Sequence, residues 1–88
     1  MAYRIELAPE AVRDLSKLDR QAAIRVQRFL RERVGVLDDP RLLGGPLVGV
    51  PYWRYRMGDY RILTEIRDDM LLVLVVEVGH RSEIYCRR

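Results

Sequence analysis

The amino-terminal half of the chain carries apolar residues at the three- and four-residue spacings of amphipathic helices. Before them, residues 3–8 alternate weakly and predict a first strand. Pro9 opens the first helix, where its missing amide hydrogen costs little. Asp19 is a candidate N-cap for a second helix over residues 20–34. The buried stripes of the two helices are expected at Ala11, Val12, Leu15 and Leu18, and at Ala22, Ala23, Val26, Leu30 and Val34.

The carboxyl-terminal half has the period-two pattern and the apolar runs that are typical of strands. Residues 35–51 are rich in proline and glycine and are expected to form a connecting loop, with Leu43 and Leu47 covering the core. The strands are predicted at residues 52–57, 60–67 and 70–78, while residues 82–85 either add a last short strand or run across the sheet. The order βααβββ predicts an α+β fold, a mostly antiparallel sheet with two amino-terminal helices packed on one face.

The register of the first hairpin follows from its two-residue loop, Gly58-Asp59, in which glycine comes first and favours a type II′ turn. Arg56 then lies directly opposite Arg61. The face expected to lie under the helices holds Trp53, Tyr55, Met57, Tyr60, Ile62 and Ile66. The opposite, open face is expected to hold Arg54, Arg56 and Arg61, continued by Leu72, Leu74, Val76 and Val78 of the next strand.

Two like charges directly opposite each other destabilise a strand pair by some tenths of a kcal/mol, up to roughly 1 kcal/mol. A sequence selected for stability alone would rarely place Arg56 opposite Arg61 and beside Arg54. An anionic ligand would relieve this repulsion. The alternative is a solvated polar face on which the arginines have no ligand.

The composition is that of one small globular domain, spanning residues 1–88, with 49% apolar and 33% charged residues. The single cysteine, Cys86, excludes an internal disulfide. No signal peptide is visible, and the longest apolar run, residues 70–76, is far shorter than the ~20 residues that a membrane helix needs. We therefore expect a soluble, cytoplasmic protein that does not bind a membrane.

Basic residues dominate the charge, with fifteen arginines, one lysine and a net charge of +3. This excess is too moderate to establish nucleic-acid binding. The outer face of the second predicted helix carries Arg25, Arg28 and Arg31. These three are candidate RNA contacts, with a solvated helix face as the equal alternative.

The chemistry open to such residues is limited. With one cysteine, one histidine and no clustered carboxylates, the sequence has no metal-ligand pattern, and we expect no metal and no cofactor. RNA, however, supplies its own nucleophile, the 2′-hydroxyl, and fixed guanidiniums can stabilise the phosphorane that its attack forms. Tyr85 could be the base if neighbouring arginines lower its pKa, whereas His80 would need less adjustment. The spacing does not decide between them.

The segment Trp53–Ile62 (WRYRMGDYRI), followed by Val78–Tyr85 (VGHRSEIY), resembles the RelE toxins of bacterial toxin–antitoxin systems, within the RelE/ParE superfamily. The opening Pro9-Glu10-Ala11 and the loop over residues 40–51 also fit, so the resemblance covers essentially the whole chain. It implies a βααβββ protein that enters the ribosomal A site and cleaves the mRNA there without a metal.

By the same resemblance, three positions match the family's catalytic residues: Arg61, Arg81 and Tyr85. Arg54 and Arg56 stand where the best-studied branch has two lysines, so they can hold the scissile phosphate but cannot transfer a proton. His80 is a helper candidate, and its alternative is an exposed turn residue. Arg25, Arg28 and Arg31 would contact ribosomal RNA phosphates.

The resemblance also implies partners: a RelB-like antitoxin, the ribosome with its mRNA, and operator DNA only through the antitoxin complex. Two alternatives remain at this point. One is a ParE-like protein that binds and inhibits DNA gyrase without chemistry of its own. The other is a non-catalytic corepressor that acts only together with its antitoxin.

Overall fold

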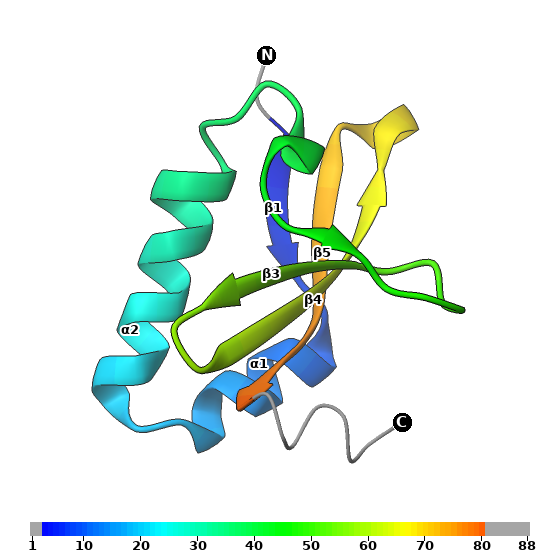
Figure 1. Cartoon of the computed structure of the whole chain (residues 1–88). Helices are drawn as coiled ribbons and strands as arrows, with labels where there is room; N and C mark the ends of the chain where they lie inside the picture. Colours follow the sequence, from blue (N-terminus) through cyan, green and yellow to red (C-terminus); the bar gives the residue numbers. More distant parts are fainter. Residues whose placement is uncertain (1–2, 81–88) are drawn as a thin grey trace.

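The computed structural model describes residues 3–80, which form a five-stranded sheet and two α-helices (Figure 1). Arg81, Tyr85 and Cys86, and the segment 82–85, lie outside the described residues. The strands are β1 (Arg4–Leu7), β2 (Gly45–Pro46), β3 (Trp53–Met57), β4 (Tyr60–Arg67) and β5 (Leu72–His80). The helices are α1 (Pro9–Lys17) and α2 (Arg20–Phe29), with α2 continuing as a π-helical turn over Leu30–Val34.

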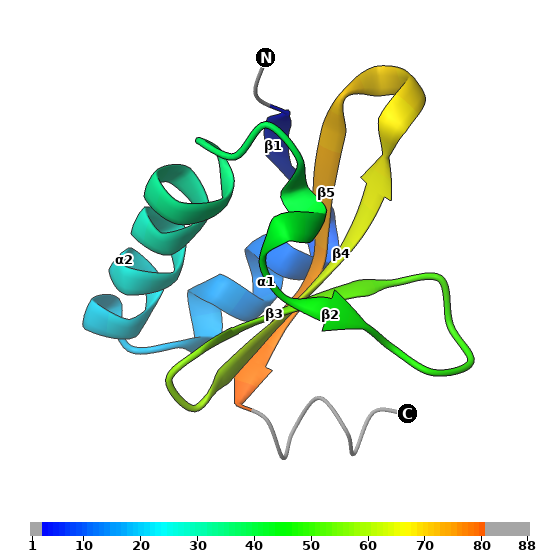
Figure 2. The same ribbon diagram turned by 45° about the horizontal axis from the view of Figure 1, so that its top comes forward.

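The strands follow one another in the sheet as β1-β5-β4-β3-β2, and β1 pairs with β5 in parallel while the other pairs are antiparallel. Figures 1 and 2 show α1 and α2 on the same side of the strongly twisted sheet. The predicted α+β class and its helix placement are confirmed. The two-residue strand β2 was not predicted, because residues 35–51 carry no alternating pattern.

The helices begin where the sequence predicts. Pro9 is the first residue of α1, and the carboxylate of Asp19 accepts a hydrogen bond from the amide of Ala22 at 3.0 Å, which caps α2. In α1 the prediction for Val12 is wrong: its side chain is 52% exposed, whereas Leu15, three positions on, is buried. The apolar stripe of α1 is therefore narrower than predicted.

A hydrogen bond from α1 to the sheet has no counterpart in the sequence analysis. Asp14 is buried, and its Oδ2 accepts a hydrogen bond from the amide of Val78 at 3.0 Å. Because β1 pairs with β5 only over residues 72–75, it leaves the later amides of β5 without a strand partner on that side. Asp14 supplies one acceptor there and so fixes α1 against β5.

The hairpin of β3 and β4 has the predicted register, with Arg56 opposite Arg61. Gly58 has a φ of +59°, while Asp59, the other turn residue, has no positive φ, as a type II′ turn requires. Tyr55 and Ile62 face the helices and are fully buried, and Trp53 is partly buried against the same core. The prediction that Trp53 and Tyr55 belong to the core is confirmed.

The pairing of β4 with β5 contains a β-bulge that the sequence analysis did not predict. Leu63 lies opposite Glu77, but the next residue, Thr64, lies opposite Val75, so Val76 is the extra residue of β5. A bulge reverses the alternation of faces beyond it. The expectation that Leu72, Leu74, Val76 and Val78 share one open face is therefore wrong, since Val78 belongs to the core beside Ile62.

Candidate functional site

The predicted arginine face lies on the side of the β3–β4 hairpin that is turned away from the helices. Arg56 is exposed and Arg54 is half-buried, whereas Arg61 is only 6% exposed. The expectation that all three lie open to solvent is therefore wrong for Arg61. Arg56 is therefore open to solvent at this face, whereas Arg61 is almost entirely removed from it.

An acidic residue joins the arginines on this face. The bulge places Glu77 opposite Leu63, and therefore on the face of Arg61, at a diagonal position across the two strands. Sequence reasoning missed Glu77 because it continued a strict alternation through β5. The available signal was a single acid within an otherwise apolar run. Glu77 places a carboxylate within reach of the buried Arg61.

His80 is the last residue of β5 and not a turn residue. It pairs with Tyr60, and the two rings meet edge to face at 6.0 Å between centroids. Since Tyr60 lies on the face of the core, the imidazole lies on the opposite face from Arg61, whose partner on β5 is Gly79. His80 is thus adjacent in sequence to Gly79, the partner of Arg61, but its imidazole points to the other face of the sheet.

The three arginines of the second helix are all exposed and follow one another at spacings of three around its outer surface, so Arg25 and Arg31 lie on different flanks. A guanidinium nitrogen of Arg25 would be 3.9 Å from a Cβ on Gly58, which places Arg25 beside the β3–β4 turn. Arg31 lies on the other flank of α2. Arg28, between them in sequence, lines none of the hollows described below.

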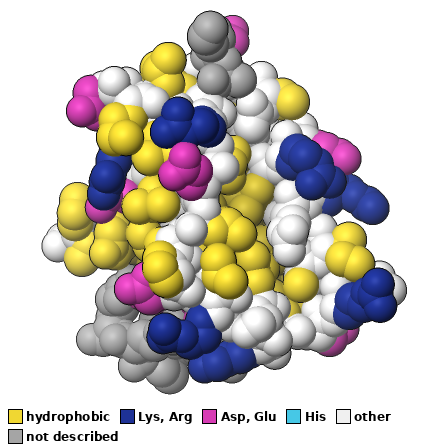
Figure 3. Space-filling model, turned by 180° about the vertical axis from the view of Figure 1, so that it is seen from behind, with side chains coloured by type: hydrophobic (Ala, Val, Ile, Leu, Met, Phe, Trp, Pro, Cys, Tyr) yellow, Lys and Arg dark blue, Asp and Glu magenta, His cyan; other side chains and the backbone are white. Residues whose placement is uncertain are grey.

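The flank of Arg31 borders an apolar groove of about 420 Å³ between β1 and the end of α2. Its lining residues are Ile5, Leu7, Gln27, Leu30, Arg31 and Gly35. Seen from behind, the molecule shows apolar side chains gathered over the middle of its surface (Figure 3).

On the flank of Arg25 the structure has a different hollow, of about 360 Å³, which reaches from the end of α2 around the edge of β3 that β2 leaves unpaired beyond Arg54. We call it the hairpin groove, and it is lined by Phe29, Arg33, Leu43, Gly44, Arg56, Met57 and Gly58. A second hollow of about 280 Å³ shares Gly44 and Arg56 with it and reaches Arg54. Arg33 was missed by the sequence analysis. Arg33 follows Phe29 by four residues and Arg25 by eight, a spacing that places all three on one flank of a helix and could have indicated it.

The floor of both hollows depends on Gly44, which has a φ of +80°. A Cβ there would lie 2.3 Å from the carbonyl oxygen of Arg54 and 2.9 Å from the ring of Tyr55. Only glycine allows the loop to pass this close to β3. The same loop is held by the indole of Trp53, whose Nε1 donates to the carbonyl of Leu43 at 2.7 Å.

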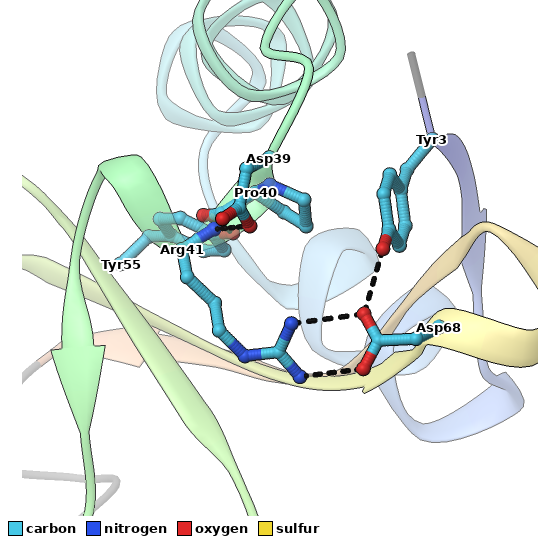
Figure 4. Close-up of polar contacts among 6 residues, drawn as sticks. All are labelled: Tyr3, Asp39, Pro40, Arg41, Tyr55 and Asp68. Atoms are coloured by element: carbon cyan, nitrogen blue, oxygen red, sulfur yellow. Dashed lines mark hydrogen bonds and ion pairs between the residues drawn. The ribbon is translucent and has the colours of Figure 1, made fainter. Parts of the chain in front are cut away.

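Three residues before Gly44, the loop is held by a cluster that we call the clamp, formed by Tyr3, Arg41 and Asp68 (Figure 4). Arg41 donates two hydrogen bonds to the carboxylate of Asp68, at 2.9 and 3.1 Å, and the hydroxyl of Tyr3 donates to it at 2.6 Å. These bonds, that of Arg41 foremost, hold the pKa of Asp68 below its ordinary value. For Tyr3 the direction is opposite: its hydrogen bond to the Asp68 carboxylate raises the pKa of its phenol.

Beneath the clamp, the hydroxyl of Tyr55 donates to the carbonyl of Pro40 at 2.7 Å (Figure 4). Burial raises the pKa of this phenol well above its ordinary value, so Tyr55 remains a neutral donor. Tyr55 is therefore a structural residue that fixes the loop and not a candidate base.

Among residues 3–80, no group of three or more His, Cys, Asp or Glu side chains could hold a metal ion. None of the helices in this part of the chain is long and apolar enough to cross a membrane.

A family of known proteins matches nearly the whole chain: the ParE toxins of type II toxin–antitoxin systems, over residues 5–85. The mRNA interferase toxin RelE of Escherichia coli K12 is 31% identical over 90 residues, which cover 97% of this chain and 92% of that protein. Toxin RelG of Mycobacterium tuberculosis is 34% identical over 92 residues, covering 99% and 100%. The chain belongs to the RelE/ParE family of type II toxins.

Solved structures of family members have the same fold. The toxin–antitoxin complex RelBE2 of M. tuberculosis contains a chain that superposes with a TM-score of 0.84 at 28% identity, covering 93% of this chain and 94% of that one. A chain of the intact E. coli RelBE complex gives a TM-score of 0.72 at 26% identity, covering 90% and 96%. The family description that matches this chain names ParE toxins. The similar proteins and the similar solved structures given above are RelE-type toxins.

Proposed function

We propose that this toxin cleaves mRNA on the translating ribosome, as a metal-independent endoribonuclease of the cytoplasm. The observation that carries the proposal is the pairing of Arg56 with Arg61 on the helix-free face of the hairpin, with Arg54 beside them. Like charges directly opposite each other destabilise a strand pair, and an anionic ligand bound at the exposed Arg56 would relieve that repulsion. The RelE relatives named as mRNA interferases support a ribonucleotide as that anion.

In the proposed reaction the 2′-oxygen forms a bond to the adjacent phosphorus, and the bond from phosphorus to the 5′-oxygen breaks. A base takes the proton of the 2′-hydroxyl, and the departing 5′-oxygen gains a proton. Arg54 and Arg56 hold the phosphate at the surface, while Arg61 stabilises the phosphorane charge from its buried position. Preorganised charge needs little rearrangement during the reaction, which suits the burial of Arg61.

The two remaining roles belong to residues outside 3–80. Arg81 would add charge stabilisation, and Tyr85 would act as base or orienting group. The edge-to-face contact of His80 with Tyr60, on the opposite face of the sheet, favours Tyr85 over His80 as the base. Arg25, Arg28 and Arg31 would contact ribosomal RNA phosphates, each from its own position around α2.

A RelB-like antitoxin is the proposed resting partner. Solved complexes of RelE-like toxins with RelB antitoxins from M. tuberculosis, E. coli and Methanococcus jannaschii support it. Operator DNA would be reached only through that antitoxin. Gyrase inhibition, the activity that the sequence analysis kept as an alternative, becomes an outcome of the test.

The test maps RNA 5′ ends in a translating extract, and on the same mRNA without ribosomes, for wild type, Tyr85→Phe and Arg61→Gln. We expect cuts within codons that require ribosomes and that fall by about 10²–10³-fold in Arg61→Gln. Arg67→Gln is the matched control, because Arg67 lies on the same strand but is exposed and paired with Glu65. Thermal melts establish that each variant is folded.

Ribosome-dependent cuts that persist undiminished in Tyr85→Phe would move the base to His80 or to the surroundings of the RNA. A folded wild-type protein that makes no cuts would refute the proposed activity and direct the work to gyrase or to a regulatory role.

A further inference from the structure

One line of side chains, on α2 and on the π-helical turn that continues it, faces the β3–β4 hairpin. Arg25, Phe29 and Arg33 are spaced by four residues, so they lie above one another on the same flank of the helix. Arg25 reaches the turn at Gly58, and both Phe29 and Arg33 line the hairpin groove. The turn lies beside α2 in both views of the ribbon (Figures 1 and 2).

This groove carries positive charge without a balancing acid. Arg33 and Arg56 line it, Arg25 lies at its end, and none of its lining residues is acidic. All three arginines are exposed, and none forms a hydrogen bond or ion pair with another residue in 3–80. Elsewhere in this range, Arg41 and Arg67 are each paired with a carboxylate. The groove is therefore complementary to an anion.

The floor between these arginines is apolar. Phe29, Leu43 and Met57 are half-buried and pack against the core. The ring of Phe29 meets Tyr55 edge to face at 6.4 Å between centroids, which fixes its orientation. Arginines around an aromatic ring are a combination that binds single-stranded nucleic acid. The arginines contact the phosphate, and the apolar surface contacts the base.

The volume of the hairpin groove, and its connection to the neighbouring hollow, indicate how much of a nucleic acid the groove can hold. The volume of about 360 Å³ is near the lower end of pockets that hold small ligands, so it accommodates one nucleotide and not a folded segment. Because Gly44 and Arg56 also line the neighbouring hollow, the groove continues to Arg54 on the arginine face. A strand whose phosphate lies at Arg54 and Arg56 would enter the groove with its next nucleotide.

We propose that the hairpin groove binds one nucleotide of single-stranded RNA beside the scissile phosphate. Arg33 holds its phosphate, with Arg25 at the far end, and Phe29 and Met57 contact its base. This inference rests on the proposed function, since it identifies where the substrate continues beyond the arginine face. It assigns a positioning role to Arg33 and Phe29, not a catalytic one.

The experiment measures binding of a fluorescent single-stranded RNA, whose 2′-hydroxyls are methylated to prevent cleavage, over a range of salt concentrations. Arg33→Gln should weaken binding about tenfold and lower the slope of log affinity against log salt by about 0.7. Phe29→Leu should weaken binding by a similar factor and leave the slope unchanged, because it removes stacking and no charge. Arg13→Gln, an exposed arginine of α1 outside the groove, is the charge-matched control.

Cleavage on programmed ribosomes provides the second readout. Arg33→Gln should raise KM with kcat nearly unchanged, the signature of a lost binding contact. Binding and KM equal to those of Arg13→Gln would overturn the inference, and so would loss of antitoxin binding with RNA binding intact, because the groove would then serve a protein. Wild-type protein that binds RNA through the groove but cuts nothing would refute the proposed function alone and leave the groove assignment standing.

Discussion

The clamp and the hairpin groove meet the same loop at neighbouring positions, Arg41 and Leu43-Gly44, and use arginine in opposite ways. In the clamp, Arg41 is held by both oxygens of Asp68 and cannot turn to a ligand without breaking those bonds (Figure 4). In the groove, Arg33 and Arg56 have no acid among the lining residues. The first arrangement holds the loop against the residue before β1 and the residue after β4, and the second leaves charge available for a ligand.

The number of arginines therefore says little about nucleic-acid binding until the partners of each arginine are known. Arg4 and Arg67, like Arg41, are paired with carboxylates within residues 3–80. A ligand competes with such a carboxylate, whereas it relieves repulsion at Arg56. Positions without an acidic partner are the ones to test first.

The largest expected effect is that of Gly44→Ala, which acts on the loop between the two regions. The new methyl group would lie 2.3 Å from the carbonyl of Arg54, in a backbone conformation that disfavours side chains. We expect a loss of about 2–3 kcal/mol in the free energy of unfolding, measured in urea. Gly45→Ala is the control, because no atom lies within 4 Å of its Cβ position. Equal stability of the two variants would show that the loop does not pass as close to β3 as described.

A smaller effect, of opposite sign, is expected for Arg56→Gln. Removing the charge opposite Arg61 should stabilise the fold by some tenths of a kcal/mol, up to about 1 kcal/mol, while RNA cleavage falls. Arg54→Gln should bring no such gain, because its direct partner is the apolar Leu63. Urea melts combined with cleavage assays check both. A destabilised Arg56→Gln would mean that this guanidinium supports the fold, and its assignment to the ligand would have to be abandoned.

The smallest effect concerns the clamp and appears only as pH falls. Since the folded state lowers the pKa of Asp68, the stabilisation is present above the ordinary carboxyl pKa of about 4 and is lost as pH falls through the lowered value. Asp68→Asn should therefore reduce the acid dependence of the melting temperature, with little effect on RNA binding. Its neighbour Asp69, which forms no clamp bond, is the control as Asp69→Asn. If the melting temperature of Asp68→Asn fell with decreasing pH as steeply as that of the wild type, the clamp would be contradicted.

Much of the fold followed from local signals. The cap at Asp19, the helical run to Val34 and the register of Arg56 against Arg61 were all predicted. Each depends on residues only a few positions apart, where spacing and turn chemistry determine geometry. The resemblance to the RelE family assigns roles to Arg81 and Tyr85. These roles stay predictions, because both residues lie outside residues 3–80.

The features that were missed depend on residues distant in sequence. Tyr3 reaches Asp68 across 65 positions and Arg41 reaches it across 27, so no local period indicates the clamp. The bulge at Val76 is a property of the pairing between β4 and β5, and it moved Glu77 to the arginine face and Val78 into the core.

Local patterns in the sequence were thus enough to predict the two helices, the four longer strands, the hairpin register and the gathering of arginines on one face. Tertiary structure decided which arginines have acidic partners, that Arg61 is buried, and that Arg33 joins Arg56 along the hairpin groove. The physical reason is that periodicity specifies on which side of its own element a residue lies. What lies opposite that side is decided only when helices, strands and loops pack together.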